Sequence, residues 1–299
     1  MSTDRGNVLA VDTEGLTKRY GDTVAISNVS LSVPAGSVFG LVGPNGAGKT
    51  TLLSVLAGLR KPTSGSIRLG ETRVGVLPDT PRFDGWLTGS EVIRLAAELA
   101  GADAGPEATA AVLATAGLTE AAHRATKGYS RGMLQRLGLA AAVVGDPGLL
   151  LLDEPAAALD PAGRREVLDL VSRLRGAATV VFSSHILDDV QEVCDSIGIL
   201  RRGEMVYQGS LYGLLAGKIW LTYVVELRSG HAAVARSLRS QEWVRSLLES
   251  NGGRLIIEVR DGEAAERNLV PVLAASGHPV VSVTPQRTSL EQVFLEVTR

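Results

Sequence analysis

The chain has 299 residues, of which 45% are hydrophobic, and a formal net charge of -2. This length fits one large domain or two modest ones, and the hydrophobic fraction is enough for a full core. The near-neutral charge argues against a nucleic-acid partner. Cys194 is the single cysteine, which excludes an internal disulfide and a thiolate zinc site. No apolar run reaches the roughly 18 residues of a membrane-spanning helix, so we expect another chain to supply any membrane span.

Strand-like and helix-like segments alternate from about residue 8 to residue 210. This alternation predicts a mostly parallel sheet surrounded by helices. Residues 38–42 and the leucine run 149–152 are short and apolar, as expected for strands that are covered on both faces. Between them, the alanine-rich stretch from about 88 to 145 predicts helices that are interrupted by turn residues at 101–106. We interpret this stretch as a helical insertion into the sheet domain.

A glycine-rich loop follows the first of these strands. Its residues are Gly43, Pro44, Asn45, Gly46, Ala47, Gly48, Lys49 and Thr50, and Thr51 continues into an apolar helix. Glycines let successive backbone N–H groups surround phosphate oxygens, and the helix directs the positive end of its dipole to the same place. Lys49 adds a point charge for the β- and γ-phosphates, and the Thr50 hydroxyl suits Mg²⁺. The strand–loop–helix order therefore predicts a nucleoside triphosphate site.

Further candidate residues stand at the ends of later segments. Asp153 ends the leucine run, which is where a phosphate loop usually finds a carboxylate for its Mg²⁺. Glu154, the next residue, can polarise a water molecule for attack on the γ-phosphate. His185 follows another apolar strand and can hydrogen-bond a phosphate oxygen. Upstream, Ser130 is an N-cap candidate and Gly132 permits close backbone approach, so this helix start is a second candidate anion site.

These motifs together resemble the ATP-binding subunit of an ABC transporter, over about residues 8–215. Residues 43–50 match the Walker A motif, residues 149–153 match Walker B, and Glu154 stands in the position of the family's catalytic carboxylate. Residues 130–136 match the family signature and residues 158–160 the D-loop. His185 matches the switch histidine, and Tyr20 the aromatic residue that stacks on adenine.

Two segments depart from the family pattern. The signature commonly reads L-S-G-G-Q, whereas residues 129–133 read Y-S-R-G-M. Ser130 and Gly132, the phosphate-facing pair, are retained, so we expect the changed positions to tune the site. Residues 74–79 resemble the Q-loop, but Asp79 stands where glutamine is usual. A carboxylate can still take a water of the Mg²⁺ shell, with a shorter reach and a different charge.

The resemblance implies a full set of site residues. It assigns catalysis to Glu154 and His185, and Mg²⁺ to Thr50, Asp153 and Asp79. It assigns ATP contacts to Tyr20, Gly43, Pro44, Asn45, Gly46, Ala47, Gly48, Lys49, Thr50, Thr51, Ser130, Gly132 and Asp160.

The composition changes after Gly217, and we interpret residues 219–299 as a small α+β domain; extra edge structure on the main domain is the alternative. Its predicted elements are strands at 220–227, 254–260 and 280–284, a helix at 263–275, helical stretches between the first two strands, and a last helix with a capping box at Ser289 and Gln292. Residues 288–296 are similar to the ending of drug- and antibiotic-exporting ABC ATPases of the daunorubicin-resistance kind, which favours an exporter over an importer.

The resemblance implies an α/β P-loop NTPase with a RecA-like, mostly parallel sheet, an antiparallel β edge and a helical subdomain at about 80–145, all within residues 8–217. Two such subunits would meet head to tail around ATP and Mg²⁺, as a homodimer or as a heterodimer with a diverged sister. A membrane-spanning permease subunit would carry the substrate, which places this chain at the cytoplasmic face of the membrane. The alternative function is a soluble ABC ATPase in assembly or translation, without transport.

Overall fold

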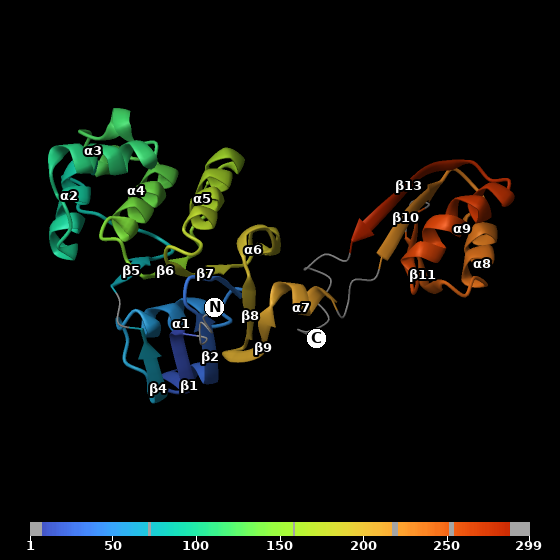
Figure 1. The fold of residues 1–299 in the computed structure, drawn as a ribbon, viewed down its shortest axis with the longest axis horizontal. Coiled ribbons are helices and arrows are strands. Elements are labelled where there is room, and N and C mark those ends of the chain that lie inside the picture. Colours follow the sequence, from blue (N-terminus) through green and yellow to red (C-terminus); the bar gives the residue numbers. More distant parts are fainter. Residues whose placement is uncertain (1–7, 71–72, 158, 217–220, 251–253, 288–299) are drawn as a thin grey trace, which may run out of the picture. The chain divides into compact units, whose positions relative to one another are not determined.

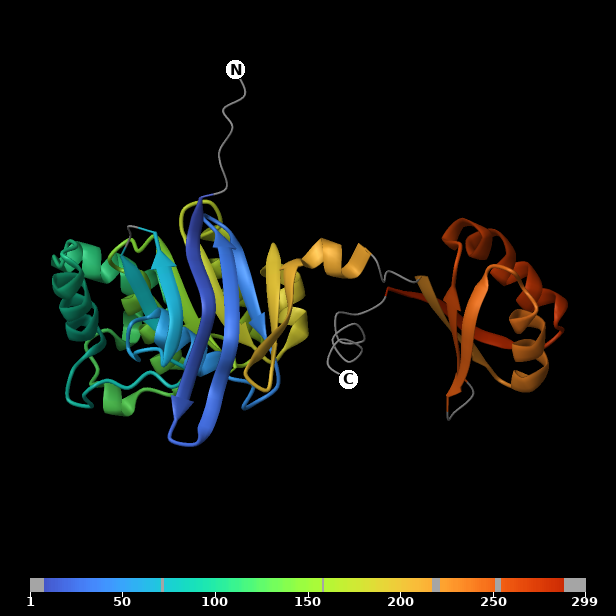
Figure 2. The same cartoon turned by 90° about the horizontal axis from the view of Figure 1, so that it is seen from below.

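The computed structural model describes residues 8–70, 73–157, 159–216, 221–250 and 254–287. The chain forms two compact units that divide between Tyr212 and Gly213. The first unit carries all the motifs of the nucleotide site, and Figures 1 and 2 show its layers from two directions. Three predicted features lie outside the described residues: the domain boundary at Gly217, Ala158 of the D-loop and the helix from Ser289.

A six-stranded sheet forms the centre of the first unit, in the order β5-β6-β7-β3-β8-β9. The strands are β5 (Val74–Leu77), β6 (Leu149–Asp153), β7 (Thr179–Ser184), β3 (Val38–Val42), β8 (Ser196–Arg201) and β9 (Glu204–Ser210). Neighbouring strands are parallel except for β9, which pairs with β8 in the antiparallel sense. Every residue of β3, β6 and β7 is buried, which explains their continuous apolar runs. The predicted mostly parallel sheet is confirmed.

A second, antiparallel sheet covers one face of the first. Its order is β2-β1-β4, from the strands β1 (Leu9–Tyr20), β2 (Thr23–Pro34) and β4 (Ser64–Leu69). Helix α1 (Lys49–Leu56) shares one hydrophobic core with both sheets, to which Leu16, Leu52 and Leu151 all belong. This packing holds the start of α1, and with it the glycine-rich loop, against the central sheet.

The helices α2 to α6 lie on the opposite side of the central sheet (Figure 1). They are α2 (Gly89–Ala100), α3 (Pro106–Thr115), α4 (Arg131–Val143), α5 (Pro161–Arg173) and α6 (Leu187–Val193), with one-turn 3₁₀ helices at Thr119–Ala121 and Thr126–Gly128. Helices α2, α3 and α4 share a core of their own, centred on Ile93, Leu113 and Leu137. This is the predicted helical insertion. Helix α7 (Leu211–Ala216) follows β9.

The second unit is a four-stranded antiparallel sheet with two helices. Its elements in chain order are β10 (Leu221–Leu227), α8 (His231–Arg239), β11 (Val244–Ser250), β12 (Arg254–Val259), α9 (Gly262–Ala275) and β13 (Val280–Arg287). The βαββαβ sequence with the order β11-β12-β10-β13 is the split βαβ arrangement of ferredoxin-like folds. The helices and one face of the sheet enclose a core that includes Val225, Leu238 and Leu269.

One prediction for this unit was wrong in part. The sequence predicts only helical stretches between the first two strands, whereas α8 is followed by the strand β11. The segment Leu247-Leu248-Glu249 lacks a clean alternation, and Leu248 is exposed although it is apolar. Pairing with β12 therefore determines this strand, because strand formation depends strongly on tertiary context.

In the described part of the chain, no helix has the length and apolar character needed to cross a membrane.

Candidate nucleotide site

The glycine-rich loop connects β3 to α1 and comes very close to neighbouring backbone. A Cβ atom at Gly43 would lie 2.3 Å from the carbonyl oxygen of Leu200. Gly48, which precedes α1, has φ +106, and a Cβ there would lie 2.5 Å from the carbonyl oxygen of Ala25. Side chains are excluded at both positions, so the loop can hold its N–H groups where phosphate oxygens can reach them.

Lys49 is the first residue of α1, and its side chain is buried, with an exposed fraction of 6%. Its Nζ donates a hydrogen bond to the carbonyl oxygen of Gly43 at 2.7 Å and lies 3.4 Å from Oε1 of Glu154. The ammonium group therefore lies across the glycine-rich loop, beside the carboxylate that follows β6. This is where charged phosphate oxygens would find a partner.

The Glu154 carboxylate lies between two nitrogen-bearing side chains, those of Lys49 and His185. Its Oε1 faces Lys49, and its Oε2 is 2.8 Å from Nδ1 of His185, which follows β7. The Glu154 side chain is 12% exposed and that of His185 46%. The backbone of Glu154 has φ +49, a left-handed conformation that is uncommon outside glycine and that marks functional sites when the surrounding structure enforces it.

Ser183 holds the two carboxylate residues in register, and the sequence analysis assigned it no role. Its hydroxyl donates to Oδ1 of Asp153 at 2.6 Å and accepts the backbone N–H of Glu154 at 2.9 Å. Ser183 is fully buried inside β7. The sequence signal was a run of polar residues at the end of an apolar strand, but a serine there has no distinctive chemistry until its partners are known.

A cleft of about 540 Å³ opens beside the loop, and we call it the loop cleft. Its lining residues are Thr23, Val24, Ala25, Asn45, Gly46, Ala47, Gly48, Lys49, Thr50, Thr51, Asp79, Glu154, Ala157 and His185. The volume is typical of small-molecule sites. Ten of the predicted site residues thus meet in one place. Asp153 lies behind Glu154 and is 4% exposed, while Gly43 and Pro44 contribute carbonyl groups to Lys49.

Three predicted residues lie in a different place, which we call the signature groove. It measures about 430 Å³ and is lined by Ser130, Gly132, Arg136, Leu159, Asp160, Ala162, Gly163 and Glu166. Ser130 caps α4 by accepting the N–H of Met133 at 3.3 Å, as the sequence predicts, and Asp160 caps α5 by accepting the N–H of Gly163 at 3.0 Å. The groove therefore gathers the N-terminal ends of two helices, which favour anions.

Tyr129 explains one departure in the signature. Its phenol donates a hydrogen bond to the carbonyl oxygen of Ala121 at 2.7 Å, and burial raises its pKa above the ordinary value. A Cβ atom at Gly89 would lie 2.3 Å from that phenol oxygen, so the glycine at the start of α2 makes room for the tyrosine. Tyr129 thus anchors the start of α4 to the helical layer, while Ser130 stays at the surface.

The side chains of Tyr20 and Asp79 are exposed and make fewer contacts than the other predicted site residues. Tyr20 ends β1, is 43% exposed and does not line the loop cleft; Nζ of Lys18 lies 5.1 Å from its ring centroid. Asp79 follows β5, is exposed and accepts a hydrogen bond from the Thr80 hydroxyl at 3.4 Å. It lines the loop cleft together with Glu154.

The residues present fit a magnesium ion that is shared with a nucleotide. Among the described residues, no three His, Cys, Asp or Glu side chains are grouped to hold a metal by themselves. Mg²⁺ in phosphate sites needs only one or two carboxylates, because phosphates and waters complete its shell. Asp153 and the exposed Thr50 hydroxyl supply oxygen atoms of this kind on the two sides of the loop.

Taken together, a glycine-rich loop at a helix start and a carboxylate pair at the end of a buried strand define a P-loop ATPase. The comparisons agree, since residues 26–157 match the family model described as ABC transporter. The ABC transporter ATP-binding protein YxlF of Bacillus subtilis is 38% identical over 95% of this chain and 98% of its own length. The chain therefore belongs to the ABC transporter ATP-binding proteins, and it is an ATPase.

Two further likenesses sharpen this assignment. The daunorubicin/doxorubicin resistance ATP-binding protein DrrA of Streptomyces peucetius is 34% identical over 97% of this chain and 92% of its own length. An ATP-binding cassette solved as a dimer in a post-hydrolysis state, bound to ADP and Pi, superposes with a TM-score of 0.61 at 25% identity. That likeness covers 67% of this chain and 98% of the cassette.

Proposed function

We propose that this chain powers export by hydrolysing ATP at two composite sites, each built from the loop cleft of one subunit and the signature groove of the other. The observation that carries the proposal is the separation of the two sets of residues within one chain. Glu154 lies in the loop cleft with Lys49, whereas Ser130 and Gly132 lie in the signature groove. The dimeric cassette with ADP and Pi supports a paired arrangement.

In this scheme the loop N–H groups and Lys49 hold the β- and γ-phosphates. Mg²⁺, held through Thr50 and Asp153, supplies charge neutralisation when bound. Glu154 orients a water for attack on the γ-phosphate, and His185 fixes the carboxylate through its 2.8 Å contact. The partner's signature groove then offers the N-terminal ends of α4 and α5 to the same phosphates. Asp79, which lines the loop cleft, would accept a hydrogen bond from a water of the Mg²⁺ shell.

The transported molecule would be carried by a separate membrane-spanning subunit. We place its docking surface on the segment between Asp79 and α2, where the indole of Trp86 is 71% exposed, and on the neighbouring helical layer. The relative named for daunorubicin and doxorubicin resistance supports export as the direction. The chain would then work at the cytoplasmic face of the membrane, and residues 219–299 would form an accessory α+β domain.

The direct test of this assignment is the Glu154→Gln variant. We expect ATP turnover to fall by roughly 10²–10⁴-fold, because the amide cannot accept a proton from the attacking water. ATP binding should stay within about twofold, since the amide keeps the shape of the side chain. Steady-state phosphate release and nucleotide titration measure the two effects. Near-normal phosphate release by this variant would contradict the role of Glu154.

A further inference from the structure

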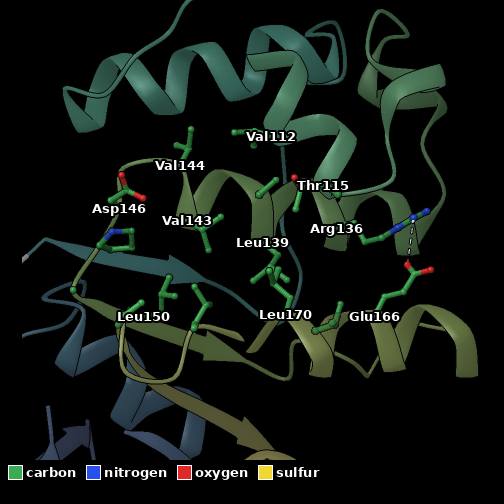
Figure 3. Close-up of a pocket in the computed structure, with 18 residues that line it drawn as sticks. Val112, Thr115, Arg136, Leu139, Val143, Val144, Asp146, Leu150, Glu166 and Leu170 are labelled. Atoms are coloured by element: carbon green, nitrogen blue, oxygen red, sulfur yellow. Dashed lines mark ion pairs between the residues drawn. The ribbon is translucent and has the colours of Figure 1, made fainter. Parts of the chain in front are cut away.

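A third cavity lies between α4 and α5, with β6 as its floor (Figure 3). Its volume is about 420 Å³, within the range of small-molecule sites. Most lining side chains are aliphatic, including Val112, Leu139, Val143 and Leu170. The cavity shares no residue with the loop cleft, and it shares Arg136 and Glu166 with the signature groove. The few polar groups that line this apolar cavity decide which ligands it can select.

The charged groups at the cavity are unbalanced. Among the residues that the structure describes, its charged lining consists of the carboxylates of Asp146 and Glu166 and the guanidinium of Arg136. Glu166 lies 4.0 Å from Nη1 of Arg136, and that guanidinium also donates to the carbonyl oxygen of Gly117 at 3.5 Å. Asp146, at the other end of the cavity (Figure 3), makes no side-chain hydrogen bond or ion pair with any described residue. Among the described residues, the Asp146 carboxylate therefore has no direct ion-pair partner, and the Arg73 guanidinium donates to the carbonyl oxygen of the neighbouring Gly145 at 3.1 Å.

The local structure restricts the backbone of Asp146. Asp146 has φ +46, and its N–H donates to the carbonyl oxygen of Val143 at the end of α4. Pro147 and Gly148 follow and lead into β6. The backbone of a residue between a helix end and a proline is restricted. The backbone position of Asp146 at this end of the cavity is thus constrained, while its side chain is exposed.

We propose that this cavity is a regulatory binding site for an organic cation with an apolar body. The body would displace water from the aliphatic walls, and its positive centre would pair with the exposed Asp146 carboxylate at one end of the cavity. An anion of the same shape would meet that carboxylate as a like charge. Since no aromatic side chain is among the described residues that line the cavity, selection would rest on the carboxylate and on shape, without cation–π contacts.

A ligand in this cavity would affect the signature groove. Ser130 caps the start of α4 and Asp160 caps the start of α5, both in the groove, and residues of both helices line the cavity. A molecule wedged between them restrains the two helix ends that the proposed function presents to the partner's nucleotide. The regulatory part of the inference therefore rests on the proposed function, whereas the binding site does not.

Binding is tested with two ions that share one apolar shape and differ in charge, tetraphenylphosphonium and tetraphenylborate, by calorimetry without ATP in sodium buffer. We expect the cation to bind at least about tenfold more tightly than the anion. Asp146→Lys should lower the affinity for the cation by about tenfold or more and raise the affinity for the anion. Asp169→Lys, on an exposed position of α5 outside the cavity, should leave both affinities within about twofold.

Three results would overturn the binding site. The first is equal affinity of the wild-type chain for both ions, and the second is cation binding that Asp146→Lys leaves unchanged. The third is displacement of the cation by excess ATP, because the cation would then occupy the loop cleft. Val143→Trp, which fills the cavity, should abolish cation binding at an unchanged unfolding temperature. If that variant fails to fold, Asp146→Lys decides alone, because its side chain is at the surface.

Regulation is tested by turnover. We expect saturating tetraphenylphosphonium to lower steady-state ATP hydrolysis at least about twofold in the wild type and not in Asp146→Lys. Binding without any change of turnover would overturn the regulatory role. A chain that binds the cation but never hydrolyses ATP would contradict the proposed function and leave the binding site standing.

Discussion

The polar side chains of the loop cleft and of the signature groove have different kinds of partner. In the loop cleft, the Glu154 carboxylate is already paired on both sides, with Lys49 at 3.4 Å and His185 at 2.8 Å. In the signature groove, the polar side chains of Ser130 and Asp160 cap helix ends. The polar groups of the first region thus find their partners within one chain. The second is assembled as a receptive surface whose positive helix ends await an anion.

The largest effect on ATP turnover is expected when a negative charge is placed in the signature groove, and this variant tests the difference between the two regions. Ser130→Asp keeps a good N-cap for α4, because aspartate caps as well as serine does. It also places a carboxylate where the proposal puts phosphate, so turnover should fall about 100-fold. Ser130→Asn, a neutral cap of the same shape, should retain most of the turnover. ATP binding to the isolated subunit should not change in either variant, and its loss would show that the groove serves the same chain.

The second effect concerns the loop cleft. Lys49→Ala removes the ammonium group that lies across the loop, and charge-assisted hydrogen bonds of this type contribute about 1.5–3 kcal/mol. We therefore expect ATP affinity to fall about 10- to 100-fold in the isolated subunit, measured by nucleotide titration. Lys127→Ala, at an exposed position outside both clefts, is the matched control and should bind as the wild type does. An unchanged affinity of Lys49→Ala would remove the loop from the binding site.

A smaller effect is expected from Ser183, which supports the loop cleft from below. Ser183→Ala leaves the buried N–H of Glu154 and one oxygen of Asp153 without their partner. We expect a loss of about 1–3 kcal/mol in the free energy of unfolding, measured with urea, together with reduced turnover. Ser54→Ala, which loses only an exposed hydrogen bond within α1, should stay within about 0.5 kcal/mol. If Ser183→Ala matched that control, the serine would have no positioning role.

The smallest effect is expected at Tyr20, which lies outside the lining of the loop cleft. If its ring stacks on adenine, Tyr20→Ala should weaken ATP binding by roughly 1 kcal/mol, or about fivefold. Tyr20→Phe keeps the aromatic face and should bind ATP nearly as the wild type does. GTP and ATP should be affected alike, because stacking tolerates any base. Equal affinities of the alanine and phenylalanine variants would refute stacking.

The sequence predicted the elements whose signal is local. The four consecutive leucines at 149–152 form a short apolar run, as expected for a strand covered on both faces, and the structure confirms the strand. Ser130 was predicted as an N-cap because a polar residue before a helical segment has few other uses, and the structure confirms it. The glycine-rich loop carried its chemistry in its spacing, so its place beside Glu154 followed from the parallel sheet.

What the sequence missed depends on contacts between distant segments. Ser183 gains its role only because β7 lies beside β6, and β11 exists because β12 pairs with it. The room that Gly89 leaves for Tyr129 joins residues that are 40 positions apart and has no local signature. The separation of the loop cleft from the signature groove is likewise a property of the folded chain, although the family resemblance implied it.

The association state of the Glu154→Gln variant tests most directly whether each ATP site is shared between two chains. Analytical ultracentrifugation with ATP and Mg²⁺ should show dimers, because bound ATP persists and joins the two surfaces. The double variant Ser130→Asp/Glu154→Gln should bind ATP equally well and stay monomeric. Dimers of the double variant, or monomers of Glu154→Gln at saturating ATP, would contradict a site shared between two chains.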